Sequence, residues 1–336
     1  MIDFVVTWLN SSDRKWQKQF AYYKDNNTDR TEAARFRDMD IFRYWFRAVE
    51  QYAPWVNKVF LVTNGVFPEW INEEHPKLVL VKHSDYIPEK YLPTFNSFTI
   101  EAFLHRIKGL SEQFVYFNDD FFLNAPVSPE NYFRNGLPCD NNAESMMNVP
   151  IYNSQDKFGI NLSILATIGV INAYFDRRKT VHQSLRRWYG LHLGKSGLLL
   201  SFMLRHSRRF IGFRLRHFEQ PLLKSTLEDA WEKAPEQLEA SCTIFRKNAQ
   251  LVPPYFFRYW QFASNRFYPV RLYRSRIYNL RISKLKGVER TLKSPTFKSV
   301  CLNDTAVCPD DEFEVISREL QRMMNQKYPS KSSFEK

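Results

Sequence analysis

The chain carries two adjacent carboxylates at the end of a stretch that predicts a buried strand. Asn118, Asp119 and Asp120 follow an aromatic and β-branched run that starts at Phe114. Acids at the carboxyl end of a strand face the crevice in which open α/β sheets bind ligands. Carboxylate and amide oxygens suit Mg²⁺ or Mn²⁺, which proteins bind through one or two carboxylates together with substrate phosphates. An Asn-Asp turn is the ordinary alternative, but the apolar run resumes at once with Phe121, so we predict a metal site at Asp119 and Asp120.

The composition indicates a folded protein with an uneven charge. Hydrophobic residues make up 44% and aromatic residues 16% of the 336 residues, which excludes a disordered chain. Residues 1–150 hold 16 Lys and Arg against 20 Asp and Glu, whereas residues 151–336 hold 32 against 16. This asymmetry predicts an anionic partner for the second part, and a phosphorylated polymer, a nucleotide, nucleic acid or an acidic membrane surface would all fit.

The cysteines and the N-terminal residues indicate the cellular location of the protein. The four cysteines show no CxxC pair and no zinc spacing, so we expect them to be reduced and structural. The N-terminus opens directly into a strand without the pattern of a signal peptide, and the apolar runs at 164–170 and 198–204 are too short to span a bilayer. We therefore expect a cytoplasmic protein.

The order of predicted elements favours an α/β sheet. Strands are predicted at 3–8, 58–63 and 78–81, and helices at 35–52 and 100–107, ahead of the strand that ends at Asn118. This order favours a largely parallel sheet. Beyond residue 150 the periodicity weakens, although 222–239 reads as an amphipathic helix. Residues 258–298 interleave Arg and Lys with aromatic residues, which is typical either of a surface for an anionic polymer or of cationic side chains around an ordinary core.

The same residues, in this order, resemble the Stealth family of hexose-1-phosphate transferases. Residues 2–13 (IDFVVTWLNSSD) are similar to the family's opening block. Residues 35–133 resemble its long second block almost throughout, including RFRDMDIFRYWFRAVEQYAPWV, KVFLVTNG, LPTFNS and FVYFNDD. A looser third block contains HFEQP, Phe245-Arg246 and residues 258–260, and the last block is CLND at 301–304. One departure is Gln250, where the family usually has an acid a few positions after the Phe-Arg pair.

The resemblance implies a fold and a reaction. The fold would be a GT-A-like or Rossmann-like α/β core with helices on both faces of a largely parallel sheet, plus a mainly helical, basic second part. The reaction would transfer a hexose-1-phosphate, such as N-acetylhexosamine-1-phosphate, from a nucleotide-diphosphate sugar to a sugar hydroxyl, with Mg²⁺ or Mn²⁺ as cofactor. The phosphodiester product would belong to a capsular polysaccharide or exopolysaccharide. Such a reaction needs in-line positioning, neutralisation of the pyrophosphate charge and a base for the acceptor hydroxyl.

The resemblance also implies roles for particular residues. Asn303 and Asp304 form a second Asn-Asp pair that would complete the metal site of Asp119 and Asp120, although an Asx-turn is the plainer interpretation of that pair alone. Arg246 and Arg37 would clamp phosphoryl oxygens, and His217 is the candidate general base. A surface charge for Arg37 and a structural histidine for His217 are the ordinary alternatives. The nucleotide side would be lined by Thr7, Trp8, Asn10, Asp13 and Asn64, of which Trp8 also suits a core position.

These expectations define four segments and two rival functions. Residues 1–150 would form the nucleotide-sugar and metal-binding core, 151–300 a basic acceptor-binding part, 301–326 a segment returning to the active site, and 327–336 a frayed tail. The basic part would bind an anionic polysaccharide or oligosaccharide acceptor, or lie against the inner face of the membrane. A metal-dependent glycosyltransferase would use the same sheet and acids but release a nucleoside diphosphate. A nucleic-acid-binding protein ranks last, because it leaves the acidic strand end unexplained.

Overall fold

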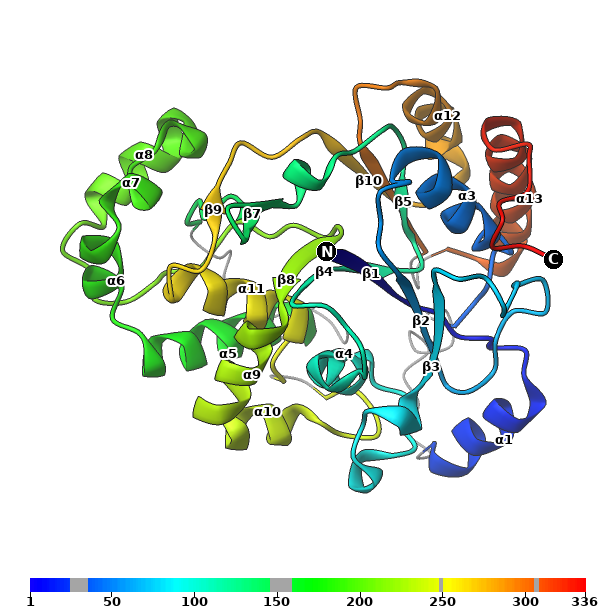
Figure 1. The fold of residues 1–336 in the computed structure, drawn as a ribbon, viewed down its shortest axis with the longest axis horizontal. Helices are drawn as coiled ribbons and strands as arrows, with labels where there is room; N and C mark the ends of the chain where they lie inside the picture. The colour runs from blue at the N-terminus through cyan, green and yellow to red at the C-terminus, as the bar shows by residue number, and fades with distance from the viewer. Residues whose placement is uncertain (25–35, 146–158, 248–249, 305–307) are drawn as a thin grey trace.

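The computed structural model describes residues 1–24, 36–145, 159–247, 250–304 and 308–336 (Figure 1). Its main sheet has five strands in the order β3-β2-β1-β4-β8. β1 (Ile2–Thr7), β2 (Val59–Thr63), β3 (Leu78–Lys82) and β4 (Gln113–Asn118) are mutually parallel, and β8 (Gln220–Leu223) is antiparallel to β4. An order of 3-2-1-4 is that of a doubly wound Rossmann-type sheet. The predicted α/β class with a largely parallel sheet is confirmed.

Alternate residues of these strands face two hydrophobic cores. Phe4, Val6 and Phe117 belong to one core, and Val5 and Tyr116 belong to the other. The first core is covered by α3 (Arg43–Tyr52), α12 (Leu285–Lys293) and α13 (Asp310–Lys327), and the second by α4 (Ser97–Ala102), α9 (Lys224–Lys233), α10 (Pro235–Ser241) and α11 (Pro253–Ala263). Strands buried on both faces explain the near-continuous apolar runs in the sequence.

Two small sheets flank the main one. β5 (Phe121–Leu123) pairs antiparallel with β11 (Ser299–Asn303), which pairs parallel with β10 (Ser275–Asn279). β6 (Phe133–Arg134), β7 (Leu137–Asp140) and β9 (Tyr268–Pro269) form the other. The remaining α-helices are α1 (Arg14–Tyr23), α5 (Gly159–Tyr174), α6 (Arg177–Gln183), α7 (Leu185–Trp188) and α8 (Gly194–Met203). Short 3₁₀ turns occupy His83–Asp85, Glu89–Tyr91, Leu104–Arg106, Pro129–Asn131, Leu191–Leu193 and Ile282–Lys284. Strands from beyond residue 150 therefore complete sheets begun before it.

Three predicted helices differ from the observed ones. The helix predicted at 100–107 is α4 at Ser97–Ala102 followed by the 3₁₀ turn Leu104–Arg106, and the other two differ for identifiable reasons. The helix predicted at 35–52 begins only at Arg43, because Asp40 has a φ of 51° and interrupts a right-handed helix; residue 35 lies outside the described residues. The helix predicted at 222–239 is two helices, because Pro235 has no backbone N–H and takes the first position of α10. Both errors come from local backbone constraints that hydrophobic periodicity does not register.

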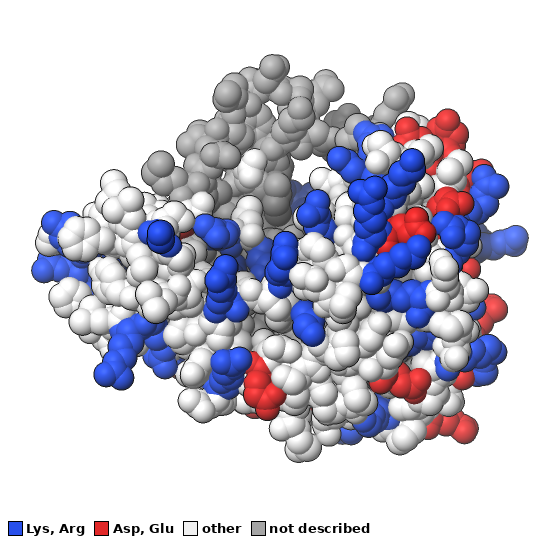
Figure 2. Space-filling view, turned by 90° about the horizontal axis from the view of Figure 1, so that it is seen from above, with Lys and Arg blue, Asp and Glu red and all other residues white. Residues whose placement is uncertain are grey.

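The charge on the surface is unevenly distributed. On the face in Figure 2, Lys and Arg stand among uncharged residues on the left-hand part, whereas on the right Asp and Glu are interspersed with Lys and Arg. The left-hand part corresponds to the arm of helices α6, α7 and α8 in Figure 1.

The C-terminal residues after Lys327, which we expected to be frayed, are packed against α3. The Arg47 guanidinium donates to both carboxylate oxygens of Glu335 at 2.7 Å, and Phe334 is buried beside Phe46. Backbone hydrogen bonds join Asn72 to Phe334 and Lys336 to Trp70. A buried ion pair and a buried phenyl ring hold this tail in place.

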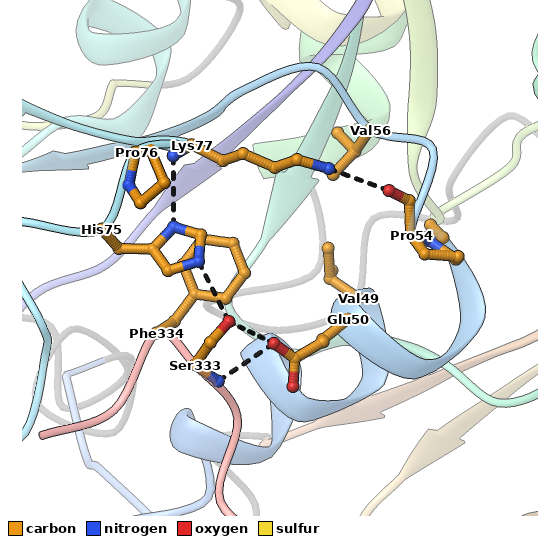
Figure 3. Close-up of a pocket in the computed structure, with 10 residues that line it drawn as sticks. Val49, Glu50, Pro54, Val56, His75, Pro76, Lys77, Ser333 and Phe334 are labelled. Atoms are coloured by element: carbon orange, nitrogen blue, oxygen red, sulfur yellow. Dashed lines mark hydrogen bonds between the residues drawn. The ribbon is translucent and has the colours of Figure 1, made fainter.

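A pocket of about 220 Å³ lies under the tail (Figure 3). Ser333 donates from its backbone and its hydroxyl to Glu50, and its hydroxyl contacts His75 Nε2 at 3.0 Å. The pocket is lined by residues that precede β2 and β3, such as Val56 and Lys77. It therefore lies at the amino ends of the strands, opposite the edge at which α/β sheets bind ligands.

Candidate active site

The carboxyl ends of β1, β2 and β4 bring most of the predicted site residues to one edge of the sheet. Thr7 pairs with Asn118 of β4 on one side and with Val62 of β2 on the other. The residues that follow these strands, Trp8, Asn64 and Asp119, therefore emerge side by side. This is the convergence that the parallel arrangement predicts.

Asp119 and Asp120 form the turn between β4 and β5. Because β5 pairs with β11, the backbone N–H of Leu302 donates to the Asp120 carbonyl at 3.0 Å, and the Cys301 thiol donates to Asp120 Oδ2 at 3.3 Å. Asp120 Oδ1 is buried and has no hydrogen-bond partner among the described residues. A buried carboxylate oxygen without a partner is costly, and a bound cation would satisfy it.

The two carboxyls have perturbed pKa values. Burial, followed by the negative charges of Asp120 and Asp38, raises the pKa of Asp119 to about 8, although the residue keeps substantial contact with solvent. Burial also raises the pKa of Asp120, against the opposing positive charge of His217. The charges of Asp120 and Asp38 both disfavour the ionised form of Asp119, so a cation beside Asp119 would be electrostatically favoured.

His217 and Cys301 approach Asp120 from distant parts of the sequence. One donor atom of each of the three residues lies within 4.8 Å of the others, which is a spacing that could hold a metal ion. Burial and the charge of Asp120 raise the pKa of the Cys301 thiol well above its ordinary value. A thiol that stays protonated is a poor ligand, so the donor set fits a cation held mainly by carboxylate oxygens, with the imidazole at hand.

Arg37 and Asp304, predicted for different roles, bind each other. Arg37 Nε and Nη2 donate to the two carboxylate oxygens of Asp304, both at 2.9 Å, and Nη1 donates to Asp310. The guanidinium also stacks on Phe313, 4.4 Å from the ring centre. The neighbouring Asn303 donates from its amide to Asn279 at 2.9 Å. Arg37 thereby fixes the segment that follows β11, the strand whose residues contact Asp120.

Arg246 belongs to a second group of polar residues, which is connected to Thr7 at the end of β1. It hydrogen-bonds the Ser97 hydroxyl, stacks on Phe98 at 4.1 Å, and its charge acts on Glu101. The Tyr116 hydroxyl donates to Glu101 at 2.9 Å and lies 3.3 Å from Thr7 Oγ1. This chain of contacts connects Arg246 to Thr7, the strand residue paired with Asn118.

Gln250 ties the loop that carries Arg246 to the LPTFNS segment. Its amide donates to Thr243 Oγ1 at 2.6 Å, and its oxygen accepts from Lys247 N at 2.7 Å and from Asn96 at 3.4 Å. These contacts require both a donor and an acceptor, which a glutamine supplies and a carboxylate does not. The departure from the family pattern is therefore accommodated by the hydrogen bonds around it.

The remaining predicted nucleotide-side residues have local roles in this structure. Asn10 accepts from Ser12, and Asp13 caps α1 by accepting from Trp16 N at 2.7 Å. Trp8 stacks on Phe42 with ring centres 5.6 Å apart. Asn64 follows β2, and its side-chain oxygen is buried without a hydrogen-bond partner among the described residues. Of these four residues, Asn64 keeps an unused polar atom for a ligand.

Two acids with perturbed pKa values were not assigned to the site from the sequence. No site role was assigned to Glu101 from the sequence, yet burial raises its pKa to about 7. None was assigned to Asp38 either, yet its charge acts on Asp119. The sequence signal for them is their position within the family's second block at 35–133, because the groups that act on them are brought close by the fold.

Comparisons with known proteins identify relatives over the whole chain. The family model described as "Stealth protein CR2, conserved region 2" matches residues 35–140. The capsular polysaccharide phosphotransferase WcwK of Streptococcus pneumoniae is 37% identical, over 100% of this chain and 99% of its own length. The receptor polysaccharide phosphotransferase WefC of Streptococcus oralis is 34% identical over 99% of both chains. The exopolysaccharide phosphotransferase cps2G of Lactiplantibacillus plantarum is 35% identical, over 100% of this chain and 96% of its own.

The structural similarity to a known glycosyltransferase is weak. A crystal structure of the galactosyltransferase LgtC with donor and acceptor sugar analogs covers 96% of this chain and 95% of its own, with 8% identity and a TM-score of 0.38. A similarity at this level does not distinguish one transfer chemistry from another.

Proposed function

Because the chain belongs to the Stealth family of polysaccharide phosphotransferases, we propose that it transfers a hexose-1-phosphate from a nucleotide-diphosphate sugar to a hydroxyl of a growing capsular polysaccharide or exopolysaccharide. Full-length similarity to three kinds of polysaccharide phosphotransferase carries this proposal, and the paired acids at the end of β4 agree with it. The chain is an enzyme that transfers a phosphate-containing group in polysaccharide biosynthesis.

The proposed step is a displacement at phosphorus. The acceptor oxygen forms a bond to the β-phosphorus, the bond between that phosphorus and the bridging oxygen breaks, and a nucleoside monophosphate leaves. The acceptor proton passes to a base, and the sugar keeps its anomeric oxygen. The protein must align the two substrates and offset the charge of the pyrophosphate.

Asp119 and Asp120 are the proposed ligands of a divalent cation, Mg²⁺ or Mn²⁺. The unpartnered Asp120 Oδ1 and the raised pKa values of both acids support this role. When bound, the cation would neutralise the negative charge of the diphosphate. Asn303 and Asp304 remain proposed contributors from β11, and Asp304 would then share its carboxylate between Arg37 and the cation.

His217 and Arg246 are proposed to act on the substrates directly. His217 lies beside Asp120 and packs edge-on against Phe121, with ring centres 4.9 Å apart, which suits a base at the acceptor hydroxyl. Arg246 would bind phosphoryl oxygens, since a guanidinium matches two of them at once.

The nucleotide is proposed to lie along the loops that follow β1 and β2. Thr7, Trp8, Asn10, Asp13 and Asn64 border these loops, and Arg37 would hold the chain beside them. The buried, unpartnered oxygen of Asn64 is the contact we consider strongest.

The acceptor is proposed to bind the basic second part, in a cytoplasmic protein that contacts the inner face of the membrane. The surplus of Lys and Arg after residue 150 suits an anionic acceptor chain or lipid surface. Within the described residues, no helix is both long enough and apolar enough to cross a membrane.

The released nucleotide tests the proposal. The purified protein is incubated with a panel of nucleotide-diphosphate sugars, Mg²⁺ or Mn²⁺ and an oligosaccharide acceptor, and the products are separated by chromatography. We expect nucleoside monophosphate together with a phosphodiester-linked oligosaccharide. Release of nucleoside diphosphate with a new glycosidic bond would instead establish glycosyl transfer, and the roles of His217 and Arg246 would then have to be reassigned.

A further inference from the structure

Helices α6, α7 and α8 form an arm on one side of the molecule that carries positive charge only. Residues 177–218 contain eleven Lys and Arg and no Asp or Glu. In Figure 1 the arm lies at the left edge, away from the main sheet. It is firmly attached: Arg177 forms a fully buried ion pair with Glu144, and the Trp188 indole donates to Asn265 at 2.9 Å. What the arm exposes is therefore a fixed surface.

Helix α8 is packed with its small residues inward. Gly197 and Ser201, four positions apart, are its buried residues, and a Cβ on Gly197 would lie 3.1 Å from Cβ of Leu193. The large apolar side chains point the other way: Leu199 is 63%, Phe202 57% and Met203 67% exposed. A helix on the surface of a globular protein ordinarily turns its large apolar side chains toward the core and polar ones toward water.

The exposed apolar side chains continue beyond α8. Leu191, just before the helix, is 90% exposed, and Leu185 on α7 is also exposed. We call Leu185, Leu191, Leu199, Phe202 and Met203 the arm patch. Scattered exposed leucines are normal, but a cluster of this kind marks an interaction site.

Cations lie on the same helices as the arm patch and next to it in the sequence. Lys195 lies on α8 itself, Arg186 on α7, and Arg205 packs over the Phe202 ring at 4.5 Å. All three are exposed, and none forms an ion pair with a carboxylate in the part of the chain that the structure describes. Apolar side chains bordered by cationic ones form the pattern of an interfacial membrane-binding helix.

We propose that the arm patch inserts into the surface of an anionic phospholipid bilayer, with Leu199, Phe202 and Met203 in the acyl-chain boundary and the cations at the lipid phosphates. This extends the membrane contact in the proposed function but does not depend on the transfer chemistry. A second copy of the chain would bring like charges together around the same patch. An anionic polysaccharide would pair with the cations and leave the aliphatic side chains in water. An anionic lipid surface would pair with the cations and also remove the aliphatic side chains from water.

Vesicle binding tests the arm patch. The full chain is mixed with vesicles of phosphatidylcholine containing phosphatidylglycerol, and the bound fraction is measured by sedimentation. Each leucine or phenylalanine that inserts adds about tenfold or more in affinity, so the double variant Leu199→Ser with Phe202→Ser is expected to bind at least about tenfold more weakly. Lys195→Ala with Arg205→Ala is expected to weaken binding to anionic vesicles by about tenfold or more and to leave binding to pure phosphatidylcholine vesicles unchanged.

A matched control lies elsewhere on the surface. Ile277 is 43% and Ile282 46% exposed, and neither belongs to the arm, so Ile277→Ser with Ile282→Ser is expected to bind vesicles like the unmodified chain. Nucleotide release with a soluble acceptor, measured on the same preparations, reports the transfer chemistry separately. It is expected to be unchanged in Leu199→Ser with Phe202→Ser and in Ile277→Ser with Ile282→Ser. The proposal is overturned if the unmodified chain does not bind anionic vesicles, or if Leu199→Ser with Phe202→Ser binds them as tightly as Ile277→Ser with Ile282→Ser does. It is also overturned if Leu199→Ser with Phe202→Ser merely converts a dimer into a monomer.

Discussion

Asp119 and Asp120 are the residues on which the proposed chemistry depends most. Replacing either with Asn keeps its size but removes the charge that would hold a divalent cation. We expect Asp119→Asn or Asp120→Asn to lower turnover by about 10²-fold or more, the scale on which single electrostatic contributors act. Because burial already raises the pKa values of both acids, and the charges of Asp120 and Asp38 raise that of Asp119 further, the neutral amides should not destabilise the fold.

The measurement is nucleotide release together with the thermal unfolding midpoint. Asp311→Asn, at an exposed position in the first turn of α13, is the matched control and should leave both unchanged. Near-normal turnover in both Asp119→Asn and Asp120→Asn would remove the metal assignment.

The position of His217 suits two roles, a general base for the acceptor hydroxyl and a ligand of the cation. If it is the base, His217→Gln should lower turnover by about 10²-fold and remove a dependence of the rate on pH, while the concentration of Mg²⁺ needed for half-maximal rate stays the same. If it binds the cation, that concentration should rise instead. Turnover that is unchanged at every pH would exclude both roles.

Glu101 should make stability depend on pH. Its pKa is about 7 in the folded protein against an ordinary value of 4.5, because burial disfavours the charged form. Between these values the unfolded chain releases a proton that the folded chain keeps, so the free energy of unfolding should fall as pH rises through that window, by up to about 3 kcal/mol. In Glu101→Gln, which can still accept from Tyr116, this fall should be much smaller. Urea unfolding at pH 5 and pH 8 measures it, and identical pH dependence in the two proteins would contradict the assignment.

Some of these residues can be predicted from a local sequence pattern, whereas others depend on contacts that form only in the folded protein. Asp119 and Asp120 are evident because they interrupt an apolar run at a strand end, which is a local pattern. Glu101 becomes unusual only when the fold buries it, with Tyr116 and Arg246 beside it opposing the rise of its pKa, and Cys301 only when β11 pairs with β5. Contacts of that sequence separation depend on the tertiary fold, and no spacing rule contains them.

At the scale of elements, the strands were predictable and several helix limits were not. β1, β2, β3 and β4 lie within about two residues of the expected strands, because β-branched and aromatic runs buried on both faces leave a clear signal. The start of α3 and the break before α10 depend on single residues, Asp40 and Pro235. The C-terminal tail was missed because its polar sequence gives no hint of the buried pair between Arg47 and Glu335.

Removing one partner of the buried Arg47–Glu335 ion pair should lower the free energy of unfolding by several kcal/mol. Glu335→Gln leaves the buried Arg47 guanidinium without a counter-charge, which costs about 3 kcal/mol or more. Lys336→Gln removes only an exposed contact with Glu73 at 4.0 Å and should change stability by less than about 0.5 kcal/mol. Urea unfolding of both variants makes the comparison. Equal stabilities would mean that the tail is held by Phe334 and backbone hydrogen bonds alone.

At the scale of the whole molecule, the two parts of the sequence build one site together. β8 extends the sheet of the first part beside β4, and β11 brings Cys301 to Asp120. His217 lies three residues before β8, so the antiparallel pairing of β8 with β4 places it at the carboxyl end of β4. Sequence order alone separates these residues by about a hundred to two hundred positions, whereas sheet pairing requires them to meet.

If this site holds the proposed cation, activity should be lost when the cation is removed. We expect chelation to abolish turnover without unfolding the protein, because the cores on both faces of the sheet do not involve the acids. Mg²⁺ or Mn²⁺ should restore the rate, since the oxygens of Asp119 and Asp120 suit hard cations and the raised pKa of Cys301 keeps its sulfur protonated. Zn²⁺ is the informative comparison, because an aspartate, a histidine and a cysteine within 4.8 Å would suit it if the thiol were ionised. Restoration by Zn²⁺ alone, and its loss in Cys301→Ser, would assign the metal to the Asp120–His217–Cys301 cluster and leave Asp119 without a ligand role.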